Sequence, residues 1–223
     1  MKAIALILVF VLFAPFYGFS QTDKEALSLK ISKAEDANLQ KLKEYVWKRK
    51  SQVFIESQLK LTTITEFSFT PDGKLDTKIV DAESTVKKKP GLRGAAQANA
   101  AEDKMDYIEK ALGLALQYTF LTKGEMLDFF SKATVTEKNG QIEAVASDVK
   151  VPGDRLLLRI DPTTYLCGYR EFSSLLGKDK LEGELNYEMF SNGTNHISTT
   201  TLDLPAKKMT IDAQNQDYTI RVK

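Results

Sequence analysis

One stretch, residues 95–131, is too apolar for an ordinary surface helix and constrains the fold more than any other part of the chain. Two adjoining apolar stripes step along it by three or four residues, which is helical spacing. A surface helix normally has an apolar arc of roughly 100°. The first stripe is Met105, Ile108, Leu112, Leu116 and Phe120; the second is Tyr107, Ala111, Leu114, Tyr118 and Leu121; the polar strip is Asp103, Asp106, Glu109, Lys110, Gly113 and Gln117. We therefore expect a long helix over residues 99–121, enclosed by other structure, and a short helix over residues 125–131.

The segments around these helices alternate with the two-residue period of strands. Residues 59–69 carry apolar or β-branched side chains at every second position and should form a long, half-buried strand. Pro71-Asp72-Gly73 predicts a turn into a partner strand over residues 75–86. Six or seven further strands are expected, joined mostly by short turns, of which Asn139-Gly140 gives the clearest hairpin signal. Their expected ranges are 134–138, 141–147, 155–161, 165–172, 181–189, 195–204 and 207–213, with a loop over residues 173–180.

These elements predict an α+β fold: a strongly curved antiparallel β-sheet, an incomplete barrel, wrapped around the long apolar helix. Ser32 and Glu35 have the spacing of a capping box, so a first helix should run from Ser32 to about Trp47. Residues 21–31 read as a loose polar leader. No repeat or linker divides the rest, so residues 32–223 are expected to form a single domain.

The first twenty residues have the pattern of a signal peptide. Lys2 is followed by an unbroken apolar run over residues 3–13, and Gly18 and Ser20 stand where a signal peptidase requires small residues. The run is too short to span a membrane. We therefore expect an exported protein, most readily periplasmic, with secretion as the alternative.

Charge and reactive residues exclude several classes of function. Without residues 1–20, 30 basic residues balance 30 acidic ones, so no global charge favours nucleic acid. Cys167 and His196 are the single cysteine and the single histidine of the chain. Cys167 alternates with Tyr165 and Tyr169 on an expected strand, which favours a buried structural thiol over a nucleophile, and His196 is expected at the surface. We predict no catalytic residues, no metal site and no cofactor.

The order of elements resembles the periplasmic lipoprotein-carrier and lipoprotein-sorting superfamily. The resemblance rests on the 59–69 strand with its Pro71-Asp72-Gly73 turn, the apolar helix 99–121, and the hairpin series 156–172 and 181–204. It implies a curved half-barrel whose helices cover an apolar cavity, and a protein that shields acyl chains without a cofactor.

An apolar sheet face beneath a lipophilic helix makes either a solid core or a cavity. Our first hypothesis is a cavity for a lipid, the acyl group of an acylated protein, or another apolar ligand. An interaction module of the cell envelope with a filled core is the alternative, and a hydrolase of unrecognised type is the second alternative. The expected cavity lining is Leu59, Leu61, Phe67, Phe69, Tyr107, Leu114 and Tyr118.

A basic loop precedes the long helix. Lys87, Lys88, Lys89 and Arg93 lie within seven residues that also contain Pro90-Gly91. The loop is either a solvated connector or a contact with an anionic surface such as lipid headgroups.

Overall fold

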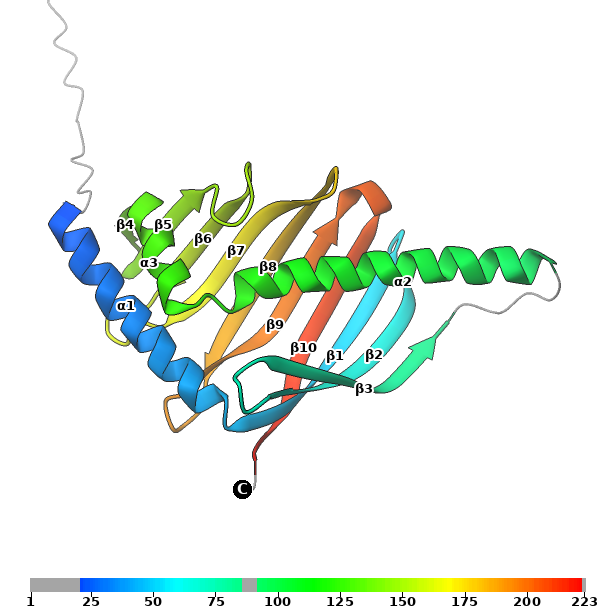
Figure 1. Ribbon diagram of the computed structural model, residues 1–223, viewed down its shortest axis with the longest axis horizontal. Helices are drawn as coiled ribbons and strands as arrows, with labels where there is room; N and C mark the ends of the chain where they lie inside the picture. The colour runs from blue at the N-terminus through cyan, green and yellow to red at the C-terminus, as the bar shows by residue number, and fades with distance from the viewer. Residues whose placement is uncertain (1–20, 86–91, 222–223) are drawn as a thin grey trace, which may run out of the picture.

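The computed structural model describes residues 21–85 and 92–221, without the side chains of residues 21, 22 and 92–101. The predicted signal peptide and Lys87, Lys88 and Lys89 lie outside this range. The fold is α+β, as predicted: one curved antiparallel sheet of ten strands carries three helices on one face (Figure 1). The sheet does not close, because β3 and β4 are its two edges in the order β3-β2-β1-β10-β9-β8-β7-β6-β5-β4.

The elements follow one another with short connections. The helices are α1 (Gln21–Leu42), α2 (Leu92–Thr119) and α3 (Lys123–Lys132), with a 3-10 turn at Pro205–Lys207. The strands are β1 (Tyr45–Ile55), β2 (Gln58–Phe69), β3 (Leu75–Ser84), β4 (Thr134–Lys138), β5 (Gln141–Ser147), β6 (Arg155–Ile160), β7 (Cys167–Leu176), β8 (Asp179–Met189), β9 (Asn195–Leu204) and β10 (Met209–Ile220).

Helix α1 corrects two predictions at the start of the chain: the loose leader over residues 21–31 and the first helix from Ser32 to about Trp47. It begins at Gln21, so residues 21–31 are helical and form no loose leader. Leu27 and Ile31 join the main core, and Lys24 donates to the carbonyls of Ser131 and Ala133, both at 3.3 Å. Tertiary packing therefore stabilises a segment whose local pattern is polar.

Strand β1 was missed entirely, because its residues up to Trp47 were assigned to a helix and the rest to no element. Its buried positions alternate as Tyr45, Trp47, Arg49, Ser51 and Val53. Two of these five inward-facing residues are polar, so the strand does not show an alternation of apolar and polar residues. The expected loop over residues 173–180 is also wrong, since β7 runs to Leu176 and β8 starts at Asp179.

Helix α2 crosses the sheet from the β2 side to the β7 side (Figure 1). The six residues of the predicted polar strip are all exposed, while Ile108, Ala111, Ala115 and Tyr118 form a buried line. The described part of the helix is therefore amphipathic, with one face exposed, and the expectation that other structure encloses it is wrong. It ends at Thr119, and α3 restarts with Thr122 as N-cap and Glu125 completing a capping box.

The close packing of the sheet depends on one glycine. Gly183 lies directly opposite Phe172 in the β7–β8 ladder, and a Cβ at this position would stand 2.2 Å from Cε1 of that buried ring. The ring of Tyr118, on α2, stacks on the Phe172 ring with 4.4 Å between the two ring centres. The Phe172 ring is 1% exposed and is packed between Gly183 and Tyr118.

We expect Gly183→Ala to lower the free energy of unfolding by about 2 kcal/mol, because overpacking forces the ring and the backbone to shift. Urea unfolding of the purified protein measures this change. Gly168→Ala is the matched control on β7, where the nearest atom would be 4.0 Å away. Equal stabilities of the two variants would contradict the prediction.

Candidate functional site

The face of the sheet that carries the helices is covered unevenly. At β6, β7 and β8, the side chains of Leu156, Leu158, Phe172, Leu181 and Leu185 are at most 1% exposed. At the opposite end, the β2 residues from Leu59 to Glu66 are only half-buried, and almost all of β3 is exposed. Ile79 on β3 is 60% exposed. The core is therefore solid at one end of the sheet and incomplete at the other.

A cleft of about 360 Å³ lies between α2 and the upper ends of β1 and β10. It is lined by Ile55, Asp103, Lys104, Tyr107, Lys207 and Met209. The Tyr107 hydroxyl donates to Asp179 at 2.9 Å, and the Lys207 ammonium lies 5.1 Å from the centre of the Tyr107 ring. The cleft thus has an apolar floor with charged groups at its rim.

The seven predicted lining residues do not meet around one cavity. Leu61, Tyr107 and Leu114 are half-buried against the main core, and Leu59 is half-buried on β2. Tyr118 is fully buried and fills the core. Phe67 and Phe69 belong to a second cluster. Among the seven, the cleft is lined by Tyr107.

The second cluster surrounds Trp47. Its ring stacks on Phe67 at 5.6 Å and on Tyr218 at 5.7 Å between ring centres, and it contacts Phe69 at 5.9 Å. Phe120, just beyond the end of α2, meets Phe69 edge to face at 5.9 Å. Trp47 is therefore a packing anchor, 2% exposed. Phe67 and Phe69 are therefore part of a packed aromatic core.

The C-terminal end of α2 is held by a buried arginine. Arg170 donates through Nη1 to the carbonyls of Tyr118 and Thr119, at 3.1 and 2.7 Å, and through Nη2 to Glu35 of α1 at 3.5 Å. A cation at this point satisfies the last carbonyls of the helix and complements its dipole. One side chain therefore joins α1, α2 and the sheet.

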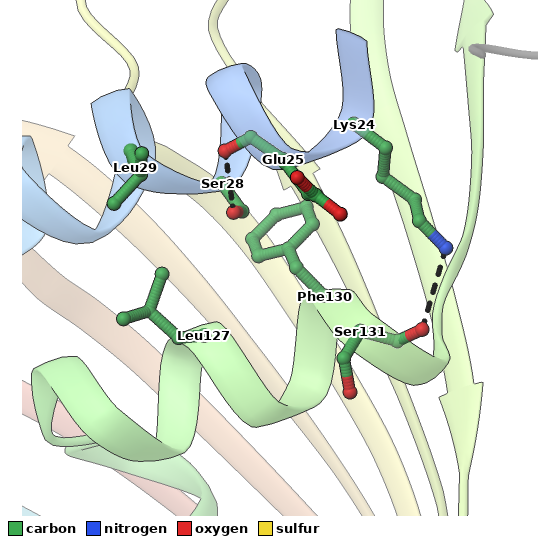
Figure 2. Close-up of a pocket in the computed structure, with 7 residues that line it drawn as sticks. All are labelled: Lys24, Glu25, Ser28, Leu29, Leu127, Phe130 and Ser131. Atoms are coloured by element: carbon green, nitrogen blue, oxygen red, sulfur yellow. Dashed lines mark hydrogen bonds between the residues drawn. The ribbon is translucent and has the colours of Figure 1, made fainter. Parts of the chain in front are cut away.

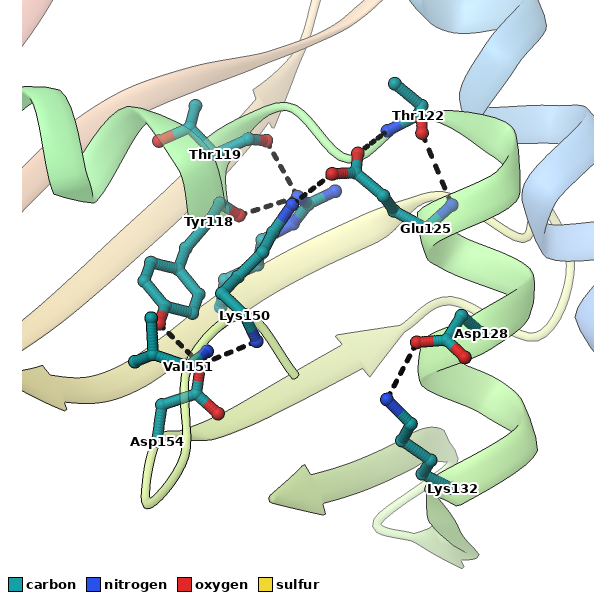
Figure 3. Close-up of polar contacts among 10 residues, drawn as sticks. Tyr118, Thr119, Thr122, Glu125, Asp128, Lys132, Lys150, Val151 and Asp154 are labelled. Atoms are coloured by element: carbon teal, nitrogen blue, oxygen red, sulfur yellow. Dashed lines mark hydrogen bonds and ion pairs between the residues drawn. The ribbon is translucent and has the colours of Figure 1, made fainter. Parts of the chain in front are cut away.

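A buried carboxylate lies next to this joint. Asp154 accepts hydrogen bonds from the backbone N–H groups of Val149, Lys150 and Val151 and from the Tyr118 hydroxyl at 2.6 Å (Figure 3). Burial alone would raise the pKa of Asp154, but these hydrogen bonds outweigh it and hold the pKa below its usual value. The ionised form is therefore the one that the fold stabilises.

A hollow of about 310 Å³ is lined by residues of α1 and α3. Figure 2 shows Leu29, Leu127 and Phe130 along it, with Lys24 reaching across to the Ser131 carbonyl. Leu29 is 56% exposed. The hollow lies on the outer side of the helix pair.

Cys167 and His196, the residues considered for catalysis or metal binding, both lie in packed structural surroundings. Burial raises the pKa of Cys167 to about 11, so the thiol stays protonated at neutral pH. His196 is buried and stacked on Phe190 at 3.9 Å, which corrects the expected surface position. In the described ranges, no group of three or more His, Cys, Asp or Glu residues is arranged to hold a metal ion. Within the same ranges, no helix is both long and apolar enough to cross a membrane.

Sequence reasoning missed Arg49, which lies on the inward face of β1. It is 7% exposed, and its guanidinium stacks 4.6 Å from the centre of the Phe67 ring. Its Nε donates to Oδ1 of Asn215 at 2.8 Å. The strand assignment itself would have revealed this residue, since it follows Trp47 by two positions. Arg93 lies in α2, and its side chain is outside the described residues.

Comparisons with known proteins give resemblances of fold without a family assignment. No family model matches the chain, and a search of curated proteins found no match. Two solved structures each align with a TM-score of 0.42. They are a DUF1329 family protein from Desulfovibrio piger, with 9% identity over 90% of this chain and 93% of the other, and a putative outer membrane lipoprotein-sorting protein domain from Vibrio parahaemolyticus, with 12% identity over 89% and 94%.

A LolA superfamily protein from Nitrosomonas europaea aligns with a TM-score of 0.32 and 11% identity over 85% of this chain and 94% of the other. The resemblance expected from the sequence is thus found among solved structures, as a similarity of fold. Similarity at these scores carries no argument about function. Any functional proposal must therefore rest on the side chains of this protein and their arrangement.

Proposed function

We propose that this protein is exported and binds an acyl chain or a similar apolar ligand between α2 and the β1–β3 end of the sheet. The observation that supports the proposal is the uneven core: apolar side chains are left half-buried at this end, while the β6–β8 end is packed solid. The cleft lined by Ile55, Tyr107 and Met209 lies at the end of β1, next to this region. Covering such a surface with an acyl chain removes apolar area from water at about 25 cal/mol per Å².

Native mass spectrometry tests this proposal directly. The protein is purified from the envelope fraction of the cells that make it and weighed before and after organic extraction. Extra mass that is lost on extraction and that fragments as an acyl lipid supports the proposal. Binding of added 1-hexadecanol to the extracted protein confirms that the site can be refilled, and failure of both measurements contradicts the proposal.

We expect Leu61→Ser to weaken hexadecanol binding about tenfold, because Leu61 lies on the inward face of β2 opposite Val53. Leu175→Ser is the matched control, since Leu175 is 48% exposed at the far end of the sheet. Calorimetric titration of the two variants and the parent protein measures the change. Equal weakening by both substitutions would argue against binding at this end of the sheet.

A second candidate function is association with another envelope protein. It is favoured by β3, an edge strand of ten residues whose side chains Ile79 and Val80 are 60% and 45% exposed. Open strand edges pair readily with extended segments of other chains. A stoichiometric protein partner in the mass spectrum, without lipid, would favour this function over the first.

A further inference from the structure

Arg49 and Arg170 are the two buried arginines of the described residues, and they differ in how their charge is balanced. Arg170 pairs with Glu35 and with two carbonyls at the end of a helix. Arg49 has no carboxylate within ion-pair distance among the described residues. Burying a cation without a counter-charge is costly, and folds tolerate it where something else is gained.

The surroundings orient Arg49 without neutralising it. Asn215 donates through its amide nitrogen to the Ile197 carbonyl at 2.9 Å, which turns its Oδ1 toward Nε of Arg49. A guanidinium has five N–H donors, and the hydrogen bond to Asn215 uses one of them. Burial lowers the pKa of Arg49 to about 10, opposed by the nearby Tyr218 phenol, so the side chain remains a cation at neutral pH.

Hydroxyl groups lie beside this cation on the same face of the sheet. In the β1–β2 ladder, Thr65 is directly opposite Arg49, and Thr63 is directly opposite Ser51. Ser51 follows Arg49 by two positions and is therefore on the same side of β1. A guanidinium with three adjacent hydroxyls offers the donors that bind a carboxylate or phosphate oxyanion.

The apolar surface continues from this polar patch toward the cleft. Val53 and Leu61 come next along the inward face, followed by Ile55 and Met209 at the cleft. Ile55 follows Arg49 by six positions along the strand, a path of about 20 Å. An extended acyl chain that reaches from the cleft to Arg49 therefore spans about 20 Å.

We propose that Arg49, with Ser51, Thr63 and Thr65, binds the oxyanion of an anionic amphiphile whose acyl chain lies along the β1–β2 surface toward the cleft. This inference rests on the proposed function and specifies the class of ligand: a single-chain or multi-chain lipid with a carboxylate or phosphate headgroup. The missing counter-charge of Arg49 is supplied by the ligand, so neutral lipids bind more weakly.

The test compares sodium palmitate, 1-hexadecanol and inorganic phosphate as ligands of the delipidated full-length mature protein. Trp47 is the single tryptophan of the chain, and it stacks on the same Phe67 ring as Arg49, so its fluorescence reports binding near the patch. Calorimetry gives the dissociation constants. We expect palmitate to bind about 10- to 100-fold more tightly than hexadecanol, as charge-assisted hydrogen bonds predict.

Arg49→Met is the decisive variant. We expect it to remove the preference for palmitate, to leave hexadecanol binding within about threefold, and to keep or raise the midpoint of thermal unfolding, because it removes a buried charge without a partner. Arg159→Met is the matched control: Arg159 is a partly exposed arginine of β6 that pairs with Glu143, and its replacement should preserve the preference.

The outcomes separate the two proposals. Equal binding of palmitate and hexadecanol to the parent protein overturns the role of Arg49 and leaves acyl binding in place. No binding of either ligand overturns the proposed function itself. Binding of phosphate that equals that of palmitate overturns the amphiphile and assigns a free oxyanion. If Arg49→Met does not fold and the parent protein shows no preference for palmitate over hexadecanol, Arg49 has a structural role instead.

Discussion

Replacing Arg170 by methionine is expected to lower the free energy of unfolding by about 3–5 kcal/mol. Arg170 is 2% exposed and donates to Glu35 and to the carbonyls of Tyr118 and Thr119. Methionine fills much of the volume but provides no donor. The Glu35 carboxylate then retains the Cys167 N–H at 2.8 Å but loses its cation, and the two helix-terminal carbonyls lose the guanidinium in a buried setting. Chemical denaturation followed by circular dichroism measures the change.

Arg159 provides a control, because it also pairs with a glutamate but lies in a more exposed environment. It pairs with Glu143 at 3.2 Å, and its side chain is 39% exposed. Exposed ion pairs contribute about 0–1 kcal/mol, so Arg159→Met should change stability little. If Arg170→Met were as stable as Arg159→Met, the buried cation would not be the joint between α1 and α2. The double variant Arg170→Met/Glu35→Gln should recover part of the loss, because it also removes the orphaned charge.

Asp154→Ala is the second substitution with a large expected effect, about 3 kcal/mol or more. The Asp154 carboxylate accepts from three consecutive backbone amides and from the Tyr118 hydroxyl, and the residue is 1% exposed. Alanine leaves the three amides without this acceptor, whereas the Tyr118 hydroxyl can still donate to Ser174 at 3.0 Å. Each buried donor that loses its partner costs about 1–3 kcal/mol before relaxation. Urea unfolding at neutral pH measures the loss.

The pH dependence of this contribution has a definite sign. The pKa of Asp154 is lower in the folded than in the unfolded protein, so its stabilisation is fully present above the usual value of 3.8 and is lost as the pH falls through the folded value. The stability difference between the parent protein and Asp154→Ala should therefore be constant from pH 7 to 5 and shrink below about pH 4. A difference that grew on acidification would contradict this assignment.

Asp128→Ala is the matched control for Asp154→Ala. Asp128 forms an exposed ion pair with Lys132 at 2.8 Å, four residues away on α3 (Figure 3). Its removal should cost well under 1 kcal/mol. A double-mutant cycle with Tyr118→Phe then isolates the Tyr118–Asp154 hydrogen bond, for which we expect a coupling energy of about 1–2 kcal/mol.

Where the sequence pattern was strong, it predicted the local structure well. Strands β4, β5 and β9 have the predicted bounds, and β2 differs by one residue at its start. The Asn139-Gly140 turn joins β4 and β5 with both residues at positive φ, as a type I′ turn requires. The polar strip of α2, from Asp103 to Gln117, is exposed as a set. Short-range periodicity and turn chemistry suffice for such elements, because they depend on neighbours close in sequence.

The errors occur where distant residues decide the structure. Residues 21–31 are helical, with Leu27 and Ile31 packed in the main core. Strand β1 was hidden because Arg49 and Ser51 occupy inward positions that a strand pattern assigns to apolar residues. Departures from local rules are expected at functional sites, and the missed strand carries the residue to which we assign ligand binding.

The sequence by itself determined the α+β class, most of the strands and turns, and the polar strip of the long helix, because periodicity and turn chemistry are local. Only the tertiary structure decided how the predicted lining divides: Phe67, Phe69 and Tyr118 fill packed clusters, whereas Leu61 and Tyr107 lie at the incompletely covered end of the sheet. It also decided that Arg170 has a counter-charge, whereas Arg49 has none among the residues that the structure describes. Burial and charge pairing depend on residues more than a hundred positions apart, such as Glu35 and Arg170, and a one-dimensional pattern contains no measure of their proximity.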